Sequence, residues 1–274
     1  MGDTGYFRDA EGHVAKYLRW REGGELGLTV AAQIEMVRTV HSFVRVARAL
    51  RSAFDGRVVP GIDAKVRELS DQPFGLQDAE GSNHTRDTMW ELFVGAVLLH
   101  IDPGLRFENP DIRLRYQGAD WAVECKVLNS KRLDQHRKLL RKAAEQIEDS
   151  TADFGLIWAN VTNQIDHVTL IAPHPGGGVL TWETRARASA AMANQVTALE
   201  SRWDHQKFRE RLGRGERDRV LRKVRGAAMF AECVVNTRGG LNDQTHTQFY
   251  GNRGLPYHEE DLVLAFAAAF DAAT

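Results

Sequence analysis

The chain has 274 residues, 43% of them hydrophobic, and a formal net charge of −1 at pH 7. This length and composition can build a sizeable core and exclude a globally disordered protein. The near-zero net charge excludes a polycation that coats or packages nucleic acid, but not an enzyme whose acidic site balances a local basic face. The two cysteines, Cys125 and Cys233, have no CxxC partner, which excludes a disulfide scaffold and fits a reducing compartment.

The first 20 residues are polar and lack the apolar core of a signal peptide. The longest apolar stretch, at 262–270, is far too short to span a bilayer. We therefore expect a cytoplasmic protein with no membrane partner.

The N-terminal part is predicted to be helical. Residues 28–55 repeat apolar side chains at helical spacing without Pro or Gly, which predicts a long amphipathic helix. Residues 59–70 start at a Pro-Gly pair and predict a short helix. The polar segment 71–83 contains Pro and Gly and predicts a loop, and 84–100 predict a third helix.

The pattern then changes to period 2. Residues 105–108 predict a short strand. Residues 111–116 and 120–128 alternate apolar and polar side chains on either side of a turn at 117–119. Together these two segments predict a β-hairpin.

A charged helix is predicted over 131–149, followed by apolar strands over 154–161 and 167–173. The central third therefore predicts a helix, three strands, a helix and a strand. The remaining predictions are helices within 184–225 and over 258–272, a buried strand over 226–236 and an edge strand over 245–251.

This order of elements predicts an α/β protein in two parts. Residues 1–80 would form a helical N-terminal lobe. Residues 81–274 would form the α/β core with a C-terminal extension.

The predicted hairpin carries the residues suited to chemistry. Side chains alternate along a strand, so Asp120, Glu124 and Lys126 point to one face, while the other face is apolar. An acid and a lysine in a strand otherwise fit for burial are costly unless they are used. Asp111 starts the neighbouring strand and could bring a second carboxylate beside Glu124.

Two carboxylates that converge beside a lysine suit metal-assisted hydrolysis of a phosphodiester. Carboxylate oxygens bind Mg²⁺, which keeps several waters for the substrate and the nucleophile. The ion would activate a bound water, and the lysine would orient or deprotonate that water or stabilise the charged transition state.

Pro110-Asp111, followed thirteen residues later by Glu124-x-Lys126, resembles the PD-(D/E)xK nuclease superfamily over about residues 84–161. The resemblance implies a restriction endonuclease-like αβββαβ core with a mixed central sheet flanked by helices. It implies Asp111 and Glu124 as metal ligands, the backbone carbonyl of Cys125 as a further ligand and Lys126 as the catalytic lysine. The implied cofactor is Mg²⁺, with Mn²⁺ as a substitute.

Two further residues match positions that members of this superfamily use. Glu91, on the helix before the strands, matches an acid that holds a water or a second metal. Gln146, on the helix after the hairpin, resembles a glutamine placed near the site, and Lys142 lies one turn earlier on the same face.

Alternatives remain for these residues. Asp120 could replace or supplement Asp111 as a metal ligand, although it lies about 13 Å along the strand from Glu124. Glu124 and Lys126 could instead form an ion pair on an exposed hairpin, and Glu91 could lie on a solvated helix face. Residues 63–65 have the same acid-x-Lys spacing, but they lie in a predicted helix. No strand that carries a carboxylate precedes them, so we expect no site there.

Basic side chains cluster on the helix that follows the hairpin. Arg137, Lys138, Arg141 and Lys142 are therefore candidates for phosphate contacts. A second basic stretch at 207–225 fits a solvated helix face at least equally well.

The sequence thus predicts a metal-dependent endonuclease, with DNA favoured over RNA. A catalytically inactive binding or assembly module is the alternative, which the presence of Asp111, Glu124 and Lys126 disfavours. A metal-independent hydrolase with paired carboxylates, as in glycosidases, would not need Lys126. A homodimer would supply the two active sites that cutting both strands requires.

Overall fold

The computed structural model describes residues 5–24, 27–70, 84–171, 182–202, 222–238 and 240–251, together with 265, 268 and 269. Six strands form one mixed sheet in the order β1-β2-β3-β4-β5-β6. β1, β2 and β3 pair antiparallel, β3, β4 and β5 pair parallel, and β6 returns antiparallel along β5. The strands are β1 (Arg106–Phe107), β2 (Ile112–Tyr116), β3 (Ala119–Val127), β4 (Phe154–Asn160), β5 (Val224–Thr237) and β6 (Gly240–Gly251).

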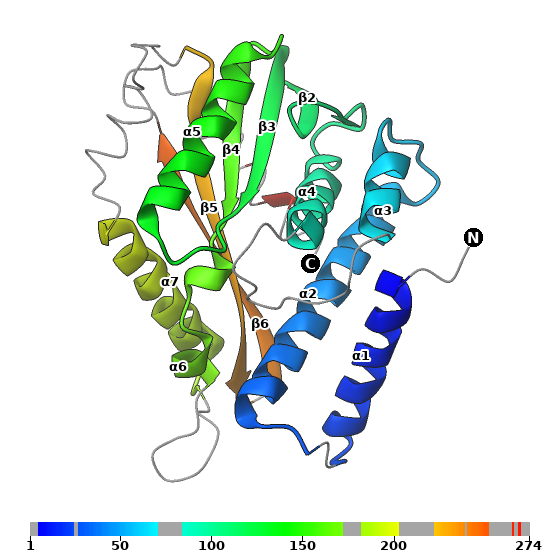
Figure 1. Cartoon of the computed structure of the whole chain (residues 1–274), viewed down its shortest axis with the longest axis vertical. Helices are drawn as coiled ribbons and strands as arrows, with labels where there is room; N and C mark the ends of the chain where they lie inside the picture. Colours follow the sequence, from blue (N-terminus) through cyan, green and yellow to red (C-terminus); the bar gives the residue numbers. More distant parts are fainter. Residues whose placement is uncertain are drawn as a thin grey trace.

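Helices cover both faces of this sheet (Figure 1). One face carries α1 (Gly5–Arg21), α2 (Val30–Phe54), α3 (Ile62–Ser70) and α4 (His84–Leu98), and the other carries α5 (Leu133–Asp149), α6 (His167–Ile171) and α7 (Arg185–Arg202). A short 3₁₀ helix, η1 (Thr162–Gln164), follows β4. The protein is therefore α/β with a mixed central sheet, as predicted.

The strand β4 is apolar up to its last residue, Asn160, and both of its faces are covered. Leu156 and Trp158 pack in the cluster beneath α4, while Ile157 and Ala159 pack in the cluster beneath α5. A parallel strand buried on both faces reads as a continuous apolar run.

The β2–β3 hairpin closes through a tight turn at Gln117 and Gly118, whose φ angles are 50° and 81°. Two consecutive positive φ values are typical of the type I′ turn, whose twist matches that of the flanking strands. The turn sets the register, in which Ile112 pairs with Val123 and Arg113 with Ala122. Asp111 is thereby placed beside the second half of β3.

Most of the predicted elements are confirmed, and one is wrong. The segment predicted as a strand over 167–173 begins with the helix α6, and its last two residues lie outside the described ones. A short apolar run does not distinguish a buried strand from a helix by its period. Asp166 caps this helix, because its Oδ1 accepts a hydrogen bond from the Thr169 backbone N at 3.2 Å. The helix α1 was not predicted.

Some predictions cannot be placed. The loop over 71–83, most of the basic stretch at 207–225 and most of the helix over 258–272 lie outside the described residues. The division near residue 80 also falls there and stays a prediction. No helix among the described residues is long and apolar enough to cross a membrane.

The contact between α5 and the sheet depends on Gly155. A Cβ added there would lie 2.3 Å from Ile147 Cγ2 and 2.9 Å from the Ala122 carbonyl oxygen. We expect Gly155→Ala to lower the free energy of unfolding by roughly 1–3 kcal/mol, the usual cost of overpacking.

Urea unfolding measures this change, and Gly12→Ala is the matched control. Nothing lies within 4 Å of a Cβ at Gly12, inside α1, so this variant should be neutral or stabilising. Equal stabilities of the Gly155→Ala variant and the wild type would contradict the close packing of α5.

Candidate functional site

Asp111, Glu124 and Lys126 meet where β2 begins. Asp111 Oδ2 accepts a hydrogen bond from the Cys125 backbone N at 2.8 Å, which fixes the carboxylate against β3. Lys126 Nζ lies 3.6 Å from Asp111 Oδ2 and donates a hydrogen bond to Glu124 Oε2. The structure therefore brings together the three residues of the predicted motif.

Glu124 is the most deeply buried of the three, with no exposed surface, whereas the side chains of Asp111 and Lys126 are 18% and 17% exposed. Its Oε1 atom is buried and has no hydrogen-bond partner among the described residues. An unpaired buried acceptor costs about 1–3 kcal/mol, more when it is charged. Glu124 does pair with Lys126, but it is buried, so the alternative of an ion pair on an exposed hairpin is wrong.

Glu91 also joins this group, and it brings two residues that were not predicted. Glu91, on α4, is 8% exposed and forms an ion pair through Oε2 with Lys65 Nζ of α3. Lys65 Nζ lies 3.5 Å from Glu68 Oε2, and Thr88 Oγ1 donates a hydrogen bond to Glu68 Oε1 at 3.1 Å. Lys65 has the spacing of the motif, and no site was expected around it. Through its ion pair with Glu91, it nevertheless belongs to the candidate site.

No signal in the sequence distinguished Lys65 and Glu68 from a solvated pair. They lie three residues apart on one helix face, which is the common arrangement of exposed charges. Their role depends on the packing of α3 against α4, which the sequence pattern does not specify.

The pKa values show that the carboxylates influence one another. Burial, followed by the charge of Asp111, raises the pKa of Glu91 and that of Glu124 to about 7, against the opposing effects of Lys65 and Lys126 respectively. Asp111 therefore lies within electrostatic reach of both glutamates.

Both lysines remain protonated in this setting. Burial disfavours the charged form of Lys126, but the charges of Asp111 and Glu124 outweigh it and raise the lysine pKa. Burial acts in the same way on Lys65, and the hydrogen bond and charge of Glu91 outweigh it and raise that pKa. An ammonium group with a raised pKa donates hydrogen bonds and does not accept a proton.

We refer to these six side chains as the acidic cluster. It consists of Lys65, Glu68, Glu91, Asp111, Glu124 and Lys126. Four carboxylates face two ammonium groups, so the fully ionised cluster carries a formal charge of −2. Such an arrangement attracts a cation.

The geometry allows a metal ion to be held by two carboxylates and offers no third carboxylate as a ligand. Among the described residues, no three His, Cys, Asp or Glu side chains gather closely enough to hold a metal ion. Mg²⁺ requires fewer, because it is commonly held by one or two carboxylates and keeps several waters. Asp111 and Glu124, with the unpaired Oε1 of Glu124, fit this requirement.

The backbone carbonyl of Cys125 is placed to add a ligand. The N–H and C=O of one strand residue point to the same edge of the strand. The Cys125 N–H points to Asp111, and the β2 pairing ends at Val123, so the carbonyl points past the end of β2. The Cys125 thiol itself is buried in the core, and burial raises its pKa.

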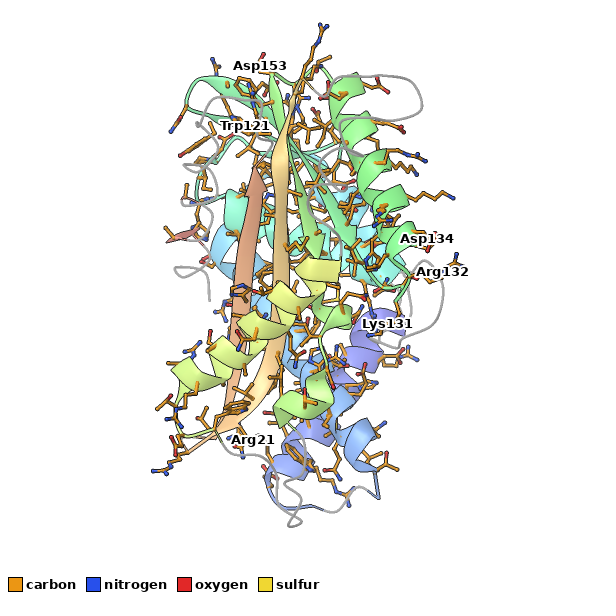
Figure 2. All side chains as sticks on the ribbon, turned by 90° about the vertical axis from the view of Figure 1, so that its left-hand side faces the viewer. Arg21, Trp121, Lys131, Arg132, Asp134 and Asp153 are labelled. Carbon is orange, nitrogen blue, oxygen red and sulfur yellow. The ribbon has the colours of Figure 1, made fainter. Side chains whose placement is uncertain are left out.

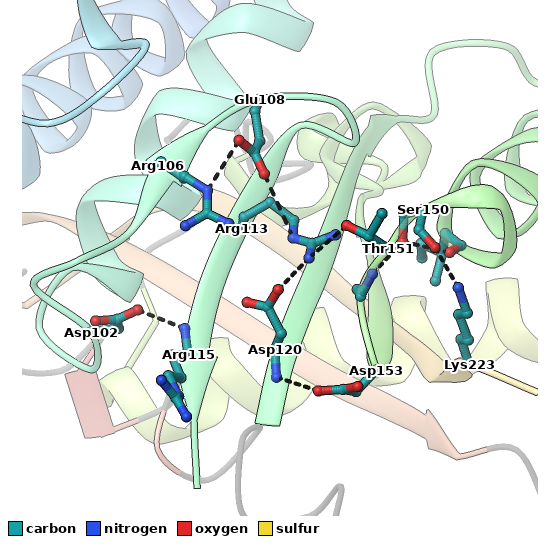
Figure 3. A network of polar contacts seen from close by, with 12 residues as sticks. Asp102, Arg106, Glu108, Arg113, Arg115, Asp120, Ser150, Thr151, Asp153 and Lys223 are labelled. Carbon is teal, nitrogen blue, oxygen red and sulfur yellow. Dashed lines mark hydrogen bonds and ion pairs between the residues drawn. The ribbon is translucent and has the colours of Figure 1, made fainter. Parts of the chain in front are cut away.

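Asp120 lies elsewhere, in a separate polar network (Figure 3). Its carboxylate forms an ion pair with Arg113, and its backbone N donates to Asp153 Oδ2 at 2.9 Å. Arg113 also donates to Thr151 Oγ1 at 3.4 Å. This network occupies Asp120, so the structure does not bring it together with Glu124.

The predicted residues of α5 lie beside the hairpin but outside these contacts. Gln146 is half-buried, and its Oε1 has no hydrogen-bond partner among the described residues. Lys138, Arg141 and Lys142 are exposed, and Arg137 is half-buried. Figure 2 shows Lys131 and Arg132, just before α5, at the edge of the molecule.

We expect the buried Glu124 carboxyl to make stability depend on pH. Its pKa rises from an ordinary value of 4.5 to about 7 on folding, so the folded state holds the proton more tightly. The associated stability is complete below about pH 4.5 and is lost as the pH rises through about 7. In the presence of a chelator, the stability of Glu124→Gln relative to the wild type should therefore rise by roughly 1–3 kcal/mol between pH 5 and 8.

Denaturant unfolding at several pH values measures the free energy of unfolding of each protein. Histidines titrate in both proteins, so their contribution cancels in the difference between variant and wild type. Glu145→Gln, at an exposed position of α5, is the matched control and should show no such trend. A gap between Glu124→Gln and wild type that stays constant with pH would contradict the buried carboxyl.

Comparison with known proteins adds no relative. No protein-family model, no curated protein and no solved structure matches the chain.

Proposed function

We propose that this protein is a metal-dependent nuclease that hydrolyses phosphodiester bonds of nucleic acid, with DNA favoured over RNA. The observation that carries the proposal is the meeting of Asp111 and Glu124 around Lys126, at the edge of a cluster with a formal charge of −2. Paired carboxylates with an adjacent lysine suit the binding of a divalent cation and an anionic substrate.

The order of elements supports the same proposal. Helix α4 precedes β1, β2 and β3, and α5 then leads to β4. The PD-(D/E)xK resemblance implies the same αβββαβ order for a restriction endonuclease-like core. Asp111 directly precedes β2, and Glu124 and Lys126 lie in the second half of β3.

The divalent cation, Mg²⁺ or Mn²⁺, would be held by Asp111, Glu124 and the Cys125 carbonyl. It would activate a water and neutralise charge on the phosphate. Lys126, protonated beside both carboxylates, would donate hydrogen bonds to the attacked phosphate group. Glu91, with a pKa of about 7, would hold or release a proton near neutral pH.

The exposed basic side chains of α5 would contact the phosphate backbone around the cleaved bond. Lys138, Arg141 and Lys142 extend from the helix that directly follows β3, and Arg137 lies beside them. Contacts of this kind add affinity without sequence specificity. A homodimer would place two such sites on the two strands of a duplex.

A nuclease assay tests the proposal directly. Plasmid, linear duplex and single-stranded DNA, and RNA, would be incubated with Mg²⁺, with Mn²⁺ or with a chelator. We expect cleavage of DNA with either ion and none with the chelator. Cleavage that persists in the chelator would favour a metal-independent hydrolase, and no cleavage of any substrate would favour the inactive binding module.

Lys126 should contribute mainly to the chemical step. We expect Lys126→Ala to lower the cleavage rate by on the order of 10²-fold or more, as the loss of a comparable charge-stabilising group does. Affinity for DNA in Ca²⁺, measured by fluorescence anisotropy, should change little. The fold should persist because a metal can replace the lysine as the counter-charge of Glu124.

Lys16→Ala, at an exposed position of α1, is the matched control and should cleave at the wild-type rate. A folded Lys126→Ala variant that cleaves as fast as the wild type would remove the lysine from the reaction.

A further inference from the structure

A second charged site lies on the other side of α4 from the acidic cluster. A cavity of about 50 Å³ opens between α2, α4 and the carboxyl ends of β3 and β4. Arg38 and Arg45 of α2 and Arg86 of α4 line it, and it shares no residue with the acidic cluster. It is therefore distinct from the proposed active site.

Arginine side chains dominate the polar part of the cavity wall. The side chains of Arg38 and Arg45 are only 10% and 6% exposed, and Arg86 is 5% exposed. Among the described residues, Glu232 is the single carboxylate that lines the cavity, and it forms an ion pair with Arg45. Arg38 Nη1 is paired in turn with Glu35 Oε2 at 3.1 Å, a residue outside the cavity lining. The three guanidinium groups thus have two carboxylate partners, and at low exposure their charges are weakly screened.

A neighbouring histidine responds to this charge. Burial, followed by the charge of Arg38, lowers the pKa of His167 to about 3. The imidazole therefore adds no further positive charge and leaves the arginines as the binding groups.

Hydrogen bonds orient the groups around the cavity. Arg86 Nη1 donates to Asn129 Oδ1 at 3.2 Å, and Asn163 Nδ2 donates to the same oxygen. Thr162 Oγ1 accepts from the Glu232 backbone N at 3.1 Å, which leaves its own hydrogen for a ligand. A preformed set of donors reduces the entropy cost of binding.

An aromatic wall makes the other side of the cavity rigid and apolar. Trp90 packs against Phe230 with ring centroids 4.8 Å apart, and Phe93 lies 5.7 Å from Trp90. Trp90 Nε1 donates to the Trp158 carbonyl oxygen at 3.0 Å, which fixes the indole. Apolar walls exclude water and strengthen the interaction of the arginines with an anion.

The position in the fold also suits a ligand. Val127 and Asn160, the last residues of the parallel strands β3 and β4, both line the cavity. Open α/β sheets bind ligands outside the carboxyl ends of their parallel strands.

We propose that this cavity binds a phosphate group. A volume of about 50 Å³ corresponds to roughly four water-sized volumes, which suits a tetrahedral oxyanion. Guanidinium groups bind phosphate oxygens in a bidentate manner, which favours arginine here. The group would come from a free phosphorylated molecule or from the terminal phosphate of a nucleic acid strand. The inference does not depend on the proposed nuclease activity.

Calorimetric titration with inorganic phosphate, at constant ionic strength and with a chelator present, tests the proposal. We expect saturable binding to the wild type and on the order of tenfold or more weaker binding to Arg38→Gln, since a charged hydrogen bond is lost. Arg48→Gln, at an exposed position of the same helix, is the matched control and should bind as the wild type does. Ser42→Asp, which places a carboxylate in the cavity wall, should also abolish binding and guards against a misfolded Arg38 variant.

A second arm compares 5′-phosphorylated and 5′-hydroxyl oligonucleotides of one sequence, again in chelator. A preference for the phosphorylated strand in the wild type that Arg38→Gln loses would identify a strand end as the source. Binding of inorganic phosphate without that preference would identify a free phosphorylated molecule. No binding of phosphate to the wild type, or equal binding by the wild type, Arg38→Gln and Ser42→Asp, would overturn the proposal.

Discussion

The burial of the Glu124 carboxylate is the constraint on which the rest of the site depends. It has no exposed surface, lies on a central strand and keeps one oxygen without a hydrogen-bond partner among the described residues. A buried charge is tolerated only when groups around it compensate. Lys126 supplies part of that compensation, and Asp111 opposes it by raising the pKa of Glu124. The surplus of carboxylates is costly for folding and favourable for binding a cation.

Several elements cooperate to maintain this arrangement. The tight turn at Gln117-Gly118 sets the register that places Asp111 beside β3, and the hydrogen bond from the Cys125 N–H holds it there. Helix α4 presents Glu91 to the same region, and α3 adds Lys65. The helices of the N-terminal segment therefore contribute to the site, in addition to covering the core.

The local features were predictable from the sequence, and the long-range contacts were not. The alternation around Gln117-Gly118 predicted the hairpin and the common face of Glu124 and Lys126, because each depends on neighbours in the chain. Lys65 was set aside because it lies in a helix that no carboxylate-bearing strand precedes. Its partner, Glu91, lies on another helix, and the pattern of residues 63–65 does not reveal that contact. The sequence left Asp120 as an alternative to Asp111 as a metal ligand, because its ion pair with Arg113 depends on the fold. The segment 167–173 was assigned to a strand because its apolar run is too short to reveal its period.

Binding of a divalent cation at Asp111 and Glu124 is the central claim, and a crystal structure of the protein grown with Mn²⁺ tests it most directly. The anomalous signal of manganese locates the ion without any assumption about activity. We expect one manganese peak in contact with both carboxylates and the Cys125 carbonyl, and we expect crystals of Asp111→Ala to lack it. Manganese bound elsewhere, or a cluster that remains metal-free at saturating Mn²⁺, would contradict it.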